Sequence, residues 1–147
     1  MSLRFTAGRS ARLFVAMMAC GVAAGASAAD TFRIRLTPVP IEASTAAATT
    51  GHGSATAELN GTKLTLKGNF TGLKGVATVA RVHEGGATGV RGPAIADFMV
   101  PAAPNGDFTA TLALTAAQAE GVRRGHVYVQ IASASAPDGN LWGWLLP

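Results

Sequence analysis

The sequence predicts an all-β fold, an antiparallel sandwich of about eight short strands accompanied by one short helix. Three observations lead to this prediction. Apolar and polar residues alternate over several short segments, turn-forming residues recur about every ten positions, and only residues 116–122 carry a helical pattern. Neither an internal repeat nor a dividing linker is present, so we expect a single domain over residues 29–147.

The first predicted strand, residues 32–36, alternates apolar residues with arginines and ends at Thr37-Pro38. Charged side chains and a proline are typical of edge strands, so we expect this strand near the edge of a sheet. Residues 38–53 consist largely of alanine, threonine, serine and proline. They are expected to form a long connection without a helix.

The strongest hairpin signal is Asn60-Gly61, which stands between two segments whose apolar residues fall at alternate positions. Those apolar residues are Ala55, Ala57, Leu59, Leu64, Leu66 and Phe70. The sequence therefore predicts two antiparallel strands joined by a tight turn.

Three further strands are expected over residues 76–83, 94–100 and 108–114. The glycine-rich segment 85–93 between the first two lacks the spacing of a phosphate-binding loop, so we interpret it as a β connection. Thr115 is the expected N-cap of the short helix that follows.

Residues 125–145 form the last predicted hairpin, with its turn at Pro137-Asp138-Gly139. One parity of its strands is aliphatic, as expected for a core-facing side: Val127, Val129, Ile131, Leu141 and Leu145. The opposite parity holds Tyr128 and Gln130 on one strand and Trp142 and Trp144 on the other.

A single outer patch would result if these strands neighbour residues 76–83, because Arg81 and His83 share one face of that strand. Its members would be Arg81, His83, Tyr128, Gln130, Trp142 and Trp144. One hypothesis is that residues 38–53 or a second copy of the chain cover the tryptophans, since large aromatic side chains usually bury much of their area. The other is that the patch binds a partner protein, a glycan or an apolar ligand.

Residues 1–28 have the three parts of a bacterial secretory signal peptide. These are a positive segment with Arg4, Arg9 and Arg12, an uncharged segment over residues 13–24, and the cleavage pattern Ala26-Ser27-Ala28. We therefore expect a periplasmic or secreted protein without a membrane span after cleavage. A lipoprotein acylated at Cys20 is a weaker alternative, because the apolar run continues past that residue.

Cleavage would remove three arginines and no acidic residue, so the formal net charge would fall from +4 to +1. A chain with so little net charge and no basic stripe is not expected to bind nucleic acid. Cleavage would also remove Cys20, the one cysteine. The predicted domain therefore has neither a disulfide nor a thiolate metal site.

Several short motifs follow one another in a recognisable order. They are His83 with Gly85, Gly92-Pro93, Tyr128-Val129-Gln130-Ile131 and Pro137-x-Gly139-x-Leu141-x-Gly143-x-Leu145, with Leu36, Gly53, Leu64 and Leu73-Lys74-Gly75 upstream. In order and spacing, residues 32–145 resemble the chordin-type (CHRD) domain family, in its bacterial single-domain form. The resemblance implies an extracytoplasmic Greek-key β-sandwich, immunoglobulin-like or copper/zinc-superoxide-dismutase-like, with no established enzymatic activity. In animals such domains occur in an extracellular antagonist of growth factors.

The chain departs from that family where the resemblance would place polar side chains. The family's His-Ile-His is Arg81-Val82-His83 here, its His-Thr pair is Ala132-Ser133, and a histidine before the proline is Ala136. The family's Glu-Ile-Arg-Gly-Gln is replaced by Asn-Leu-Trp-Gly-Trp over residues 140–144. All but one of the family histidines are thus missing, and two tryptophans occupy the last strand.

A dedicated zinc or copper site needs about three or four protein ligands. His52, His83 and His126 have no fixed spacing, so we expect no metal and no cofactor. The alternative is a periplasmic, copper-related protein with a reduced site at His83. Ser133 and Ser135 lack the G-x-S-x-G setting of a nucleophile, so no catalytic residues are expected. We predict a non-catalytic domain that acts by binding or structural association.

Overall fold

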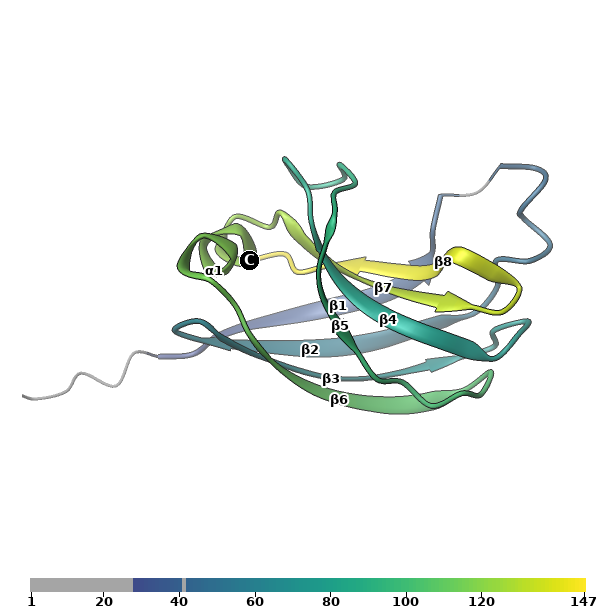
Figure 1. Cartoon of the computed structure of the whole chain (residues 1–147), viewed down its shortest axis with the longest axis horizontal. Coiled ribbons are helices and arrows are strands. Elements are labelled where there is room, and N and C mark those ends of the chain that lie inside the picture. The colour runs from purple at the N-terminus through teal and green to yellow at the C-terminus, as the bar shows by residue number, and fades with distance from the viewer. Residues whose placement is uncertain (1–27, 41) are drawn as a thin grey trace, which may run out of the picture.

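The computed structural model describes residues 28–40 and 42–147 (Figure 1). The expected signal peptide lies outside the described residues except for Ala28. The elements are β1 Asp30–Pro38, β2 His52–Asn60, β3 Lys63–Thr71, β4 Ala77–Glu84, β5 Ala94–Phe98, β6 Gly106–Ala113, α1 Ala116–Arg123, β7 Val127–Ser133 and β8 Ala136–Trp144. In this part of the chain no helix is long and apolar enough to cross a membrane.

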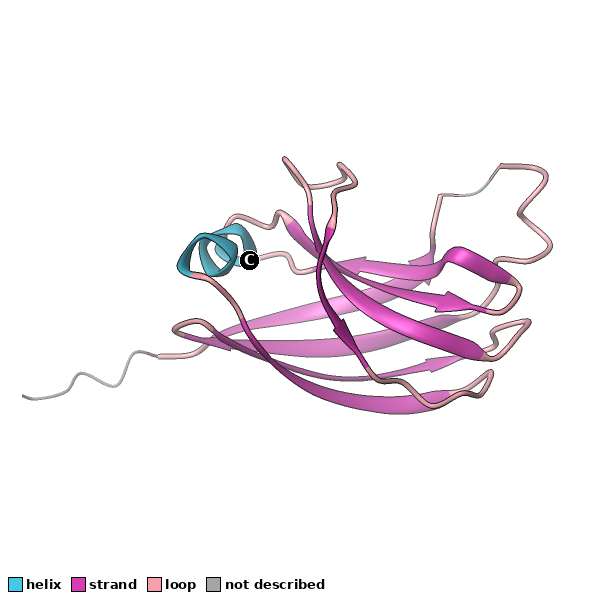
Figure 2. Ribbon diagram, viewed as in Figure 1, coloured by secondary structure: helices cyan, strands magenta, loops and turns pink. Residues whose placement is uncertain are grey.

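The eight strands form one antiparallel sheet that curls into a nearly closed sandwich (Figure 2). Their order is β5-β4-β7-β8-β1-β2-β3-β6, so β1-β2-β3-β6 make one wall and β5-β4-β7-β8 the other. After β3 the chain crosses to form β4 and β5, then returns with β6 beside β3, which is a Greek-key path. The predicted all-β antiparallel fold with a short helix is confirmed.

The core lies between the two walls and is built from alternate residues of the strands. Leu36 and Leu66 from one wall and Val82, Val129 and Leu141 from the other are fully buried. Truncating a buried Leu to Ala typically lowers the free energy of unfolding by about 2–5 kcal/mol. Small or polar residues are therefore strongly disfavoured at the inward positions. The alternation also determines which side chains of the same strands point outward.

The edge position predicted for the first strand is confirmed in part, because β1 lies between β2 and β8 in the strand order but the predicted segment, residues 32–36, pairs with β2 alone. Its pairing with β8 is short and joins only Thr37 to Trp142 and Pro38 to Leu141. The alternation of apolar residues and arginines reflects a wall with one buried and one solvent-facing side, which any strand of a sandwich can have. β1 is thus the last strand of its wall, and the two-residue pairing with β8 joins that wall to the other.

The hairpin predicted at Asn60-Gly61 is confirmed, with a small difference in where the turn begins. Asn60 is the last residue of β2 and pairs with Lys63, so Gly61 and Thr62 form the turn. Gly61 has a φ of 62° and is the first turn residue, where glycine meets no steric penalty.

The helix α1 covers one end of the sandwich (Figure 1). Thr115 and Gln118 exchange hydrogen bonds between side chain and backbone in a capping box, which confirms the predicted N-cap. In the last turn, Nε of Arg123 lies 3.0 Å from a carboxylate oxygen of Asp30 at the start of β1. Pro147 lines the same small depression as Asp30 and Arg123, so both ends of the described chain meet beside the helix.

Candidate functional site

The closing hairpin turns earlier than the sequence predicted. Its turn consists of Ala134 and Ser135, whereas Pro137-Asp138-Gly139 lies inside β8. Ser133 pairs with Ala136 but Ile131 pairs with Leu141, so residues 137–140 form a bulge in β8. Proline and glycine mark bulges as well as turns, which explains why the signal was misplaced.

Gln130 supports this bulge from the neighbouring strand. Its side-chain amide donates a hydrogen bond of 2.9 Å to the Asp138 carbonyl. Gly139 has a φ of 135°, and a Cβ added there would lie 2.6 Å from the Gln130 amide nitrogen. Gln130 is only 9% exposed, and its side-chain amide is engaged by the bulge of β8.

Strand pairing brings all six predicted site residues to one outer face. Between β4 and β7, Arg81 pairs with Gln130 and His83 with Tyr128. Between β7 and β8, Tyr128 pairs with Trp144 and Gln130 with Trp142. Side chains of directly paired residues point to the same side of a sheet. The predicted patch is therefore a real cluster, and its binding role stays a prediction.

Tyr128 is the centre of an aromatic face that comprises His83, Tyr128, Trp142 and Trp144. The His83 ring is stacked on Tyr128, with centroids 4.8 Å apart and planes 10° apart. The centroid of Trp144 lies 4.6 Å from that of Tyr128, and the centroid of Trp142 lies 5.7 Å from it in an edge arrangement. The two indoles also meet edge to face at 5.8 Å. Such pairs contribute about 0.5–1.5 kcal/mol each beyond their buried area, so the face is held in one arrangement.

The loop of residues 85–93 between β4 and β5 is fastened to the aromatic face through Gly92. The Gly92 carbonyl accepts hydrogen bonds from His83 Nδ1 at 3.0 Å and from the Tyr128 hydroxyl at 3.3 Å. Because a carbonyl oxygen can only accept, Nδ1 carries the proton of this bond. The other ring nitrogen, Nε2, is buried and has no partner among the described residues. His83 therefore holds the loop in place.

Arg91 extends from the same loop to Trp142. Its guanidinium carbon lies 5.5 Å from the centroid of the indole, within the range of a cation–π contact. Sequence reasoning missed Arg91 because the pairing of the loop with this face depends on strands distant in the sequence.

The contacts do not support the hypothesis that residues 38–53 cover the tryptophans. That segment reaches the turn end of the hairpin, where Asn140 Nδ2 donates to the Thr50 carbonyl and the Ser135 hydroxyl donates to the Ala48 carbonyl. The loop of residues 85–93 covers Tyr128 instead, through hydrogen bonds between the Tyr128 hydroxyl and the backbone of Gly92. Tyr128 is only 1% exposed, whereas Trp142 and Trp144 are partly exposed.

A groove of about 460 Å³ lies beside Arg91, between residues 39–40 and 42–49 on one side and the β8 bulge on the other. We call it the hairpin groove. Its charged lining residues are Arg91, Glu42 and Asp138. Sequence reasoning did not predict it, since its walls come from three separate segments.

Arg81 lies at the margin of the site. It forms an ion pair with Asp97 of β5, Nε to Oδ1 3.1 Å, and both side chains are well exposed. An exposed pair of this kind contributes little to stability, about 0–1 kcal/mol. Arg81 and Gln130 are therefore less central to the cluster than the four rings.

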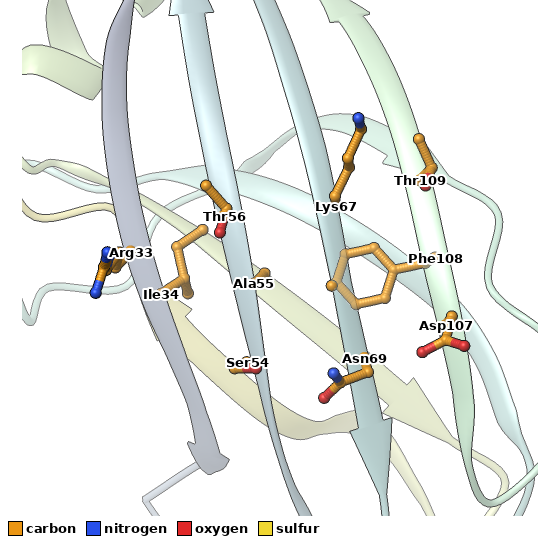
Figure 3. Close-up of a pocket in the computed structure, with 11 residues that line it drawn as sticks. Arg33, Ile34, Ser54, Ala55, Thr56, Lys67, Asn69, Asp107, Phe108 and Thr109 are labelled. Carbon is orange, nitrogen blue, oxygen red and sulfur yellow. The ribbon is translucent and has the colours of Figure 1, made fainter.

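A second depression, of about 560 Å³, lies on the outer surface of the other wall (Figure 3). Its polar lining consists of Arg33, Ser54, Thr56, Lys67, Asn69, Asp107 and Thr109. Thr56 stands between Arg33 and Lys67 in the strand pairing, so the two cations do not converge. The Phe108 ring packs on Gly68 of the neighbouring strand and is buried. This depression offers ordinary solvated strand surface.

The three histidines of the predicted domain do not converge on one site, although His83 and His126 are near each other at the paired ends of β4 and β7, where the Gly85 amide donates to the His126 carbonyl. His52 begins β2, His83 is in β4, and His126 immediately precedes β7. Within residues 28–40 and 42–147, no three His, Cys, Asp or Glu side chains form a group that could hold a metal ion.

Comparison with known proteins gives one match. The family model of the CHRD domain matches residues 32–145, which begin within β1 and end one residue after β8. No curated protein and no solved structure matches the chain.

Proposed function

The chain belongs to the CHRD domain family, and we propose on this basis that it is a non-catalytic, extracytoplasmic binding domain whose ligand surface is the aromatic face. CHRD domains are small domains of the binding type. The observation that carries the proposal is the pair of partly exposed indoles, Trp142 and Trp144, held by Tyr128 on rigid strands. Rigid tryptophans with a neighbouring arginine are typical of residues that dominate binding energy.

A glycan is the ligand class that this surface suits best. A sugar ring offers C–H groups that can pack on an indole and hydroxyl groups that can bond to charged side chains. Arg91 contacts Trp142 and also lines the hairpin groove with Asp138, so stacking and hydrogen-bonding groups adjoin. A long oligosaccharide could therefore contact the indoles and the groove together.

The surroundings of the serines support a non-catalytic role. The Ser133 hydroxyl is fully buried and donates to the Asn140 side chain at 2.8 Å. The Ser135 hydroxyl donates to the Ala48 carbonyl at 3.2 Å. Among the described residues neither serine is bonded to a histidine that could take its proton, as nucleophilic catalysis requires.

Export is the second part of the proposal, and it rests on the signal-peptide pattern of residues 1–28. Mass spectrometry of protein recovered from the periplasm and medium of a bacterial host tests it. The expected chain begins at Ala29. Protein that stays in the cytoplasm with residues 1–28 attached would contradict export.

Binding can be tested with the two tryptophans themselves, because the chain contains no others. We expect neutral oligosaccharides of sufficient length to change the indole emission and to protect it from acrylamide quenching. Calorimetric titration then compares wild type with Trp142→Ala, Trp144→Ala and the double variant. Lys67→Ala, in the depression of the other wall, is the matched control.

The proposal predicts that oligosaccharide binding is lost in the tryptophan variants and kept in Lys67→Ala. If the protein binds a monomeric detergent and no oligosaccharide, the ligand class is apolar and the glycan proposal is wrong. Thermal denaturation of the double variant supplies the remaining test. If that variant unfolds, the indoles serve the core and the proposal is wrong.

A further inference from the structure

The outer edge of β6 has no hydrogen-bonded strand beside it in the described part of the chain, and we propose that a second copy of this chain pairs with it. β5 and β6 are the two ends of the strand order and are not hydrogen-bonded to each other. Exposed backbone donors and acceptors on an edge strand are a template for another strand. The inference is independent of the aromatic face, which lies on the other wall.

The seam between β5 and β6 is fastened at one end only. Near the loop that joins them, Phe98 and Phe108 pack with ring centroids 5.4 Å apart. The loop between β5 and β6 is also hydrogen-bonded to the chain around the start of β4. The Leu73 amide donates to the Pro104 carbonyl, and the Ala77 amide donates to the Ala103 carbonyl. Among the described residues, no backbone hydrogen bond joins the rest of β6 to β5.

The core is least well covered along this seam. Four apolar residues pack against the core and yet stay partly exposed, and all of them lie in β5, in β6 or two residues after β5: Ile95, Val100, Ala110 and Leu112. Ala110 and Leu112 project from the inner side of β6, next to its free edge. A neighbouring strand would remove their remaining apolar surface from water, which favours association.

The two edges of the sheet differ in how they are protected. β5 has only five residues, its pairing with β4 contains a register shift, and Pro93 and Pro101 stand close to its ends. β6 has eight residues in unbroken register with β3. It contains no proline and no lysine or arginine, and Asp107 is its one charged residue. β6 thus lacks the features that prevent edge-to-edge pairing.

The sequence of β6 is self-complementary about Thr111. In a two-fold antiparallel pair centred there, Thr111 faces Thr111 and Thr109 faces Ala113 on the outer side. On the inner side Ala110 faces Leu112. No charge meets a like charge, because Asp107 lies outside the pair. Threonine pairs and apolar pairs across strands are both favourable.

Sedimentation velocity of the full-length protein over a range of concentrations tests the association. We expect a monomer–dimer equilibrium for the wild type. Thr111→Lys places two ammonium groups opposite each other in the proposed register and should give a monomer. Asn69→Lys is the matched control, because Asn69 is exposed on β3, which is paired on both sides, and faces no cation, so the dimer should stay intact.

Disulfide trapping tests the register itself. In a Cys20→Ser background, Thr111→Cys should cross-link under mild oxidation, because directly opposed residues bring their Cβ atoms near the separation of a disulfide. Thr56→Cys should not cross-link. A wild-type monomer at every concentration, a dimer that survives Thr111→Lys, or no cross-link at Thr111→Cys would each overturn the proposal. Trp142→Ala should leave the dimer unchanged, which separates this test from that of the proposed function.

Discussion

The imidazole ring of His83 lies parallel to the phenol ring of Tyr128, and both bond to the backbone of Gly92. This arrangement joins β4, β7 and the loop between β4 and β5 at one point. It means that His83 supports the loop carrying Arg91. The tryptophans and the loop are then parts of one structure.

His83→Ala should lower the free energy of unfolding by about 1–3 kcal/mol, since it removes one ring stack and one hydrogen bond. Urea denaturation measures the loss. His83→Phe keeps a ring in the same place and loses only the bond to Gly92, so it should be less damaging. Equal losses in the two variants would show that stacking contributes nothing.

Arg91→Ala should make Trp142 more accessible to acrylamide, because the guanidinium lies over that indole. The measurement is a quenching constant in a Trp144→Phe background, where Trp142 is the single fluorophore. Arg91→Lys retains the charge without the planar group and should give an intermediate value. Arg33→Ala, on the other wall, is the control, and an unchanged constant in Arg91→Ala would contradict the contact.

Gly139→Ala should destabilise the domain by about 1–3 kcal/mol, because the φ of 135° disfavours a side chain and the new Cβ would meet the Gln130 amide. Thermal or urea denaturation measures this. Gly86→Ala is the matched control, since a Cβ there meets no atom within 4 Å. In a Gln130→Ala background, which has already lost the hydrogen bond to the Asp138 carbonyl, Gly139→Ala should cost less because the clash is absent. A Gly139→Ala protein as stable as wild type would be inconsistent with the bulge.

Calorimetric titration with copper and zinc should show no binding tighter than micromolar, since such a site needs about three or four protein ligands. The alternative of a copper-related protein with a reduced site at His83 makes the opposite prediction. Micromolar or tighter binding that His83→Ala abolishes, and His52→Ala does not, would favour that alternative.

The general architecture was predictable because the alternation of buried and exposed residues is a local property. It located the eight strands, the helix after Thr115 and the turn at Gly61. It also placed Tyr128 and Trp142 on the side opposite Val129 and Leu141.

The features that sequence reasoning did not predict depend on interactions between distant segments. The short pairing that joins the end of β1 to β8 leaves no mark on the residues of β1, so the link between the two walls was not predicted. The turn of the last hairpin was misplaced because Pro137 and Gly139 serve a bulge, and the bulge is supported by Gln130 on another strand. The approach of Arg91 to Trp142 and the hairpin groove likewise have no local signal.

The contact between Arg123 and Asp30, with Pro147 beside them, has a consequence for how the domain could be attached to other molecules. A host protein that carried it within a surface loop would enter and leave at a single point, an arrangement that insertions tolerate well. The Ala134–Ser135 turn lies at the far end of the sandwich (Figure 1). A tether at the helix end would therefore present the hairpin groove outward, away from the surface to which the domain is fixed.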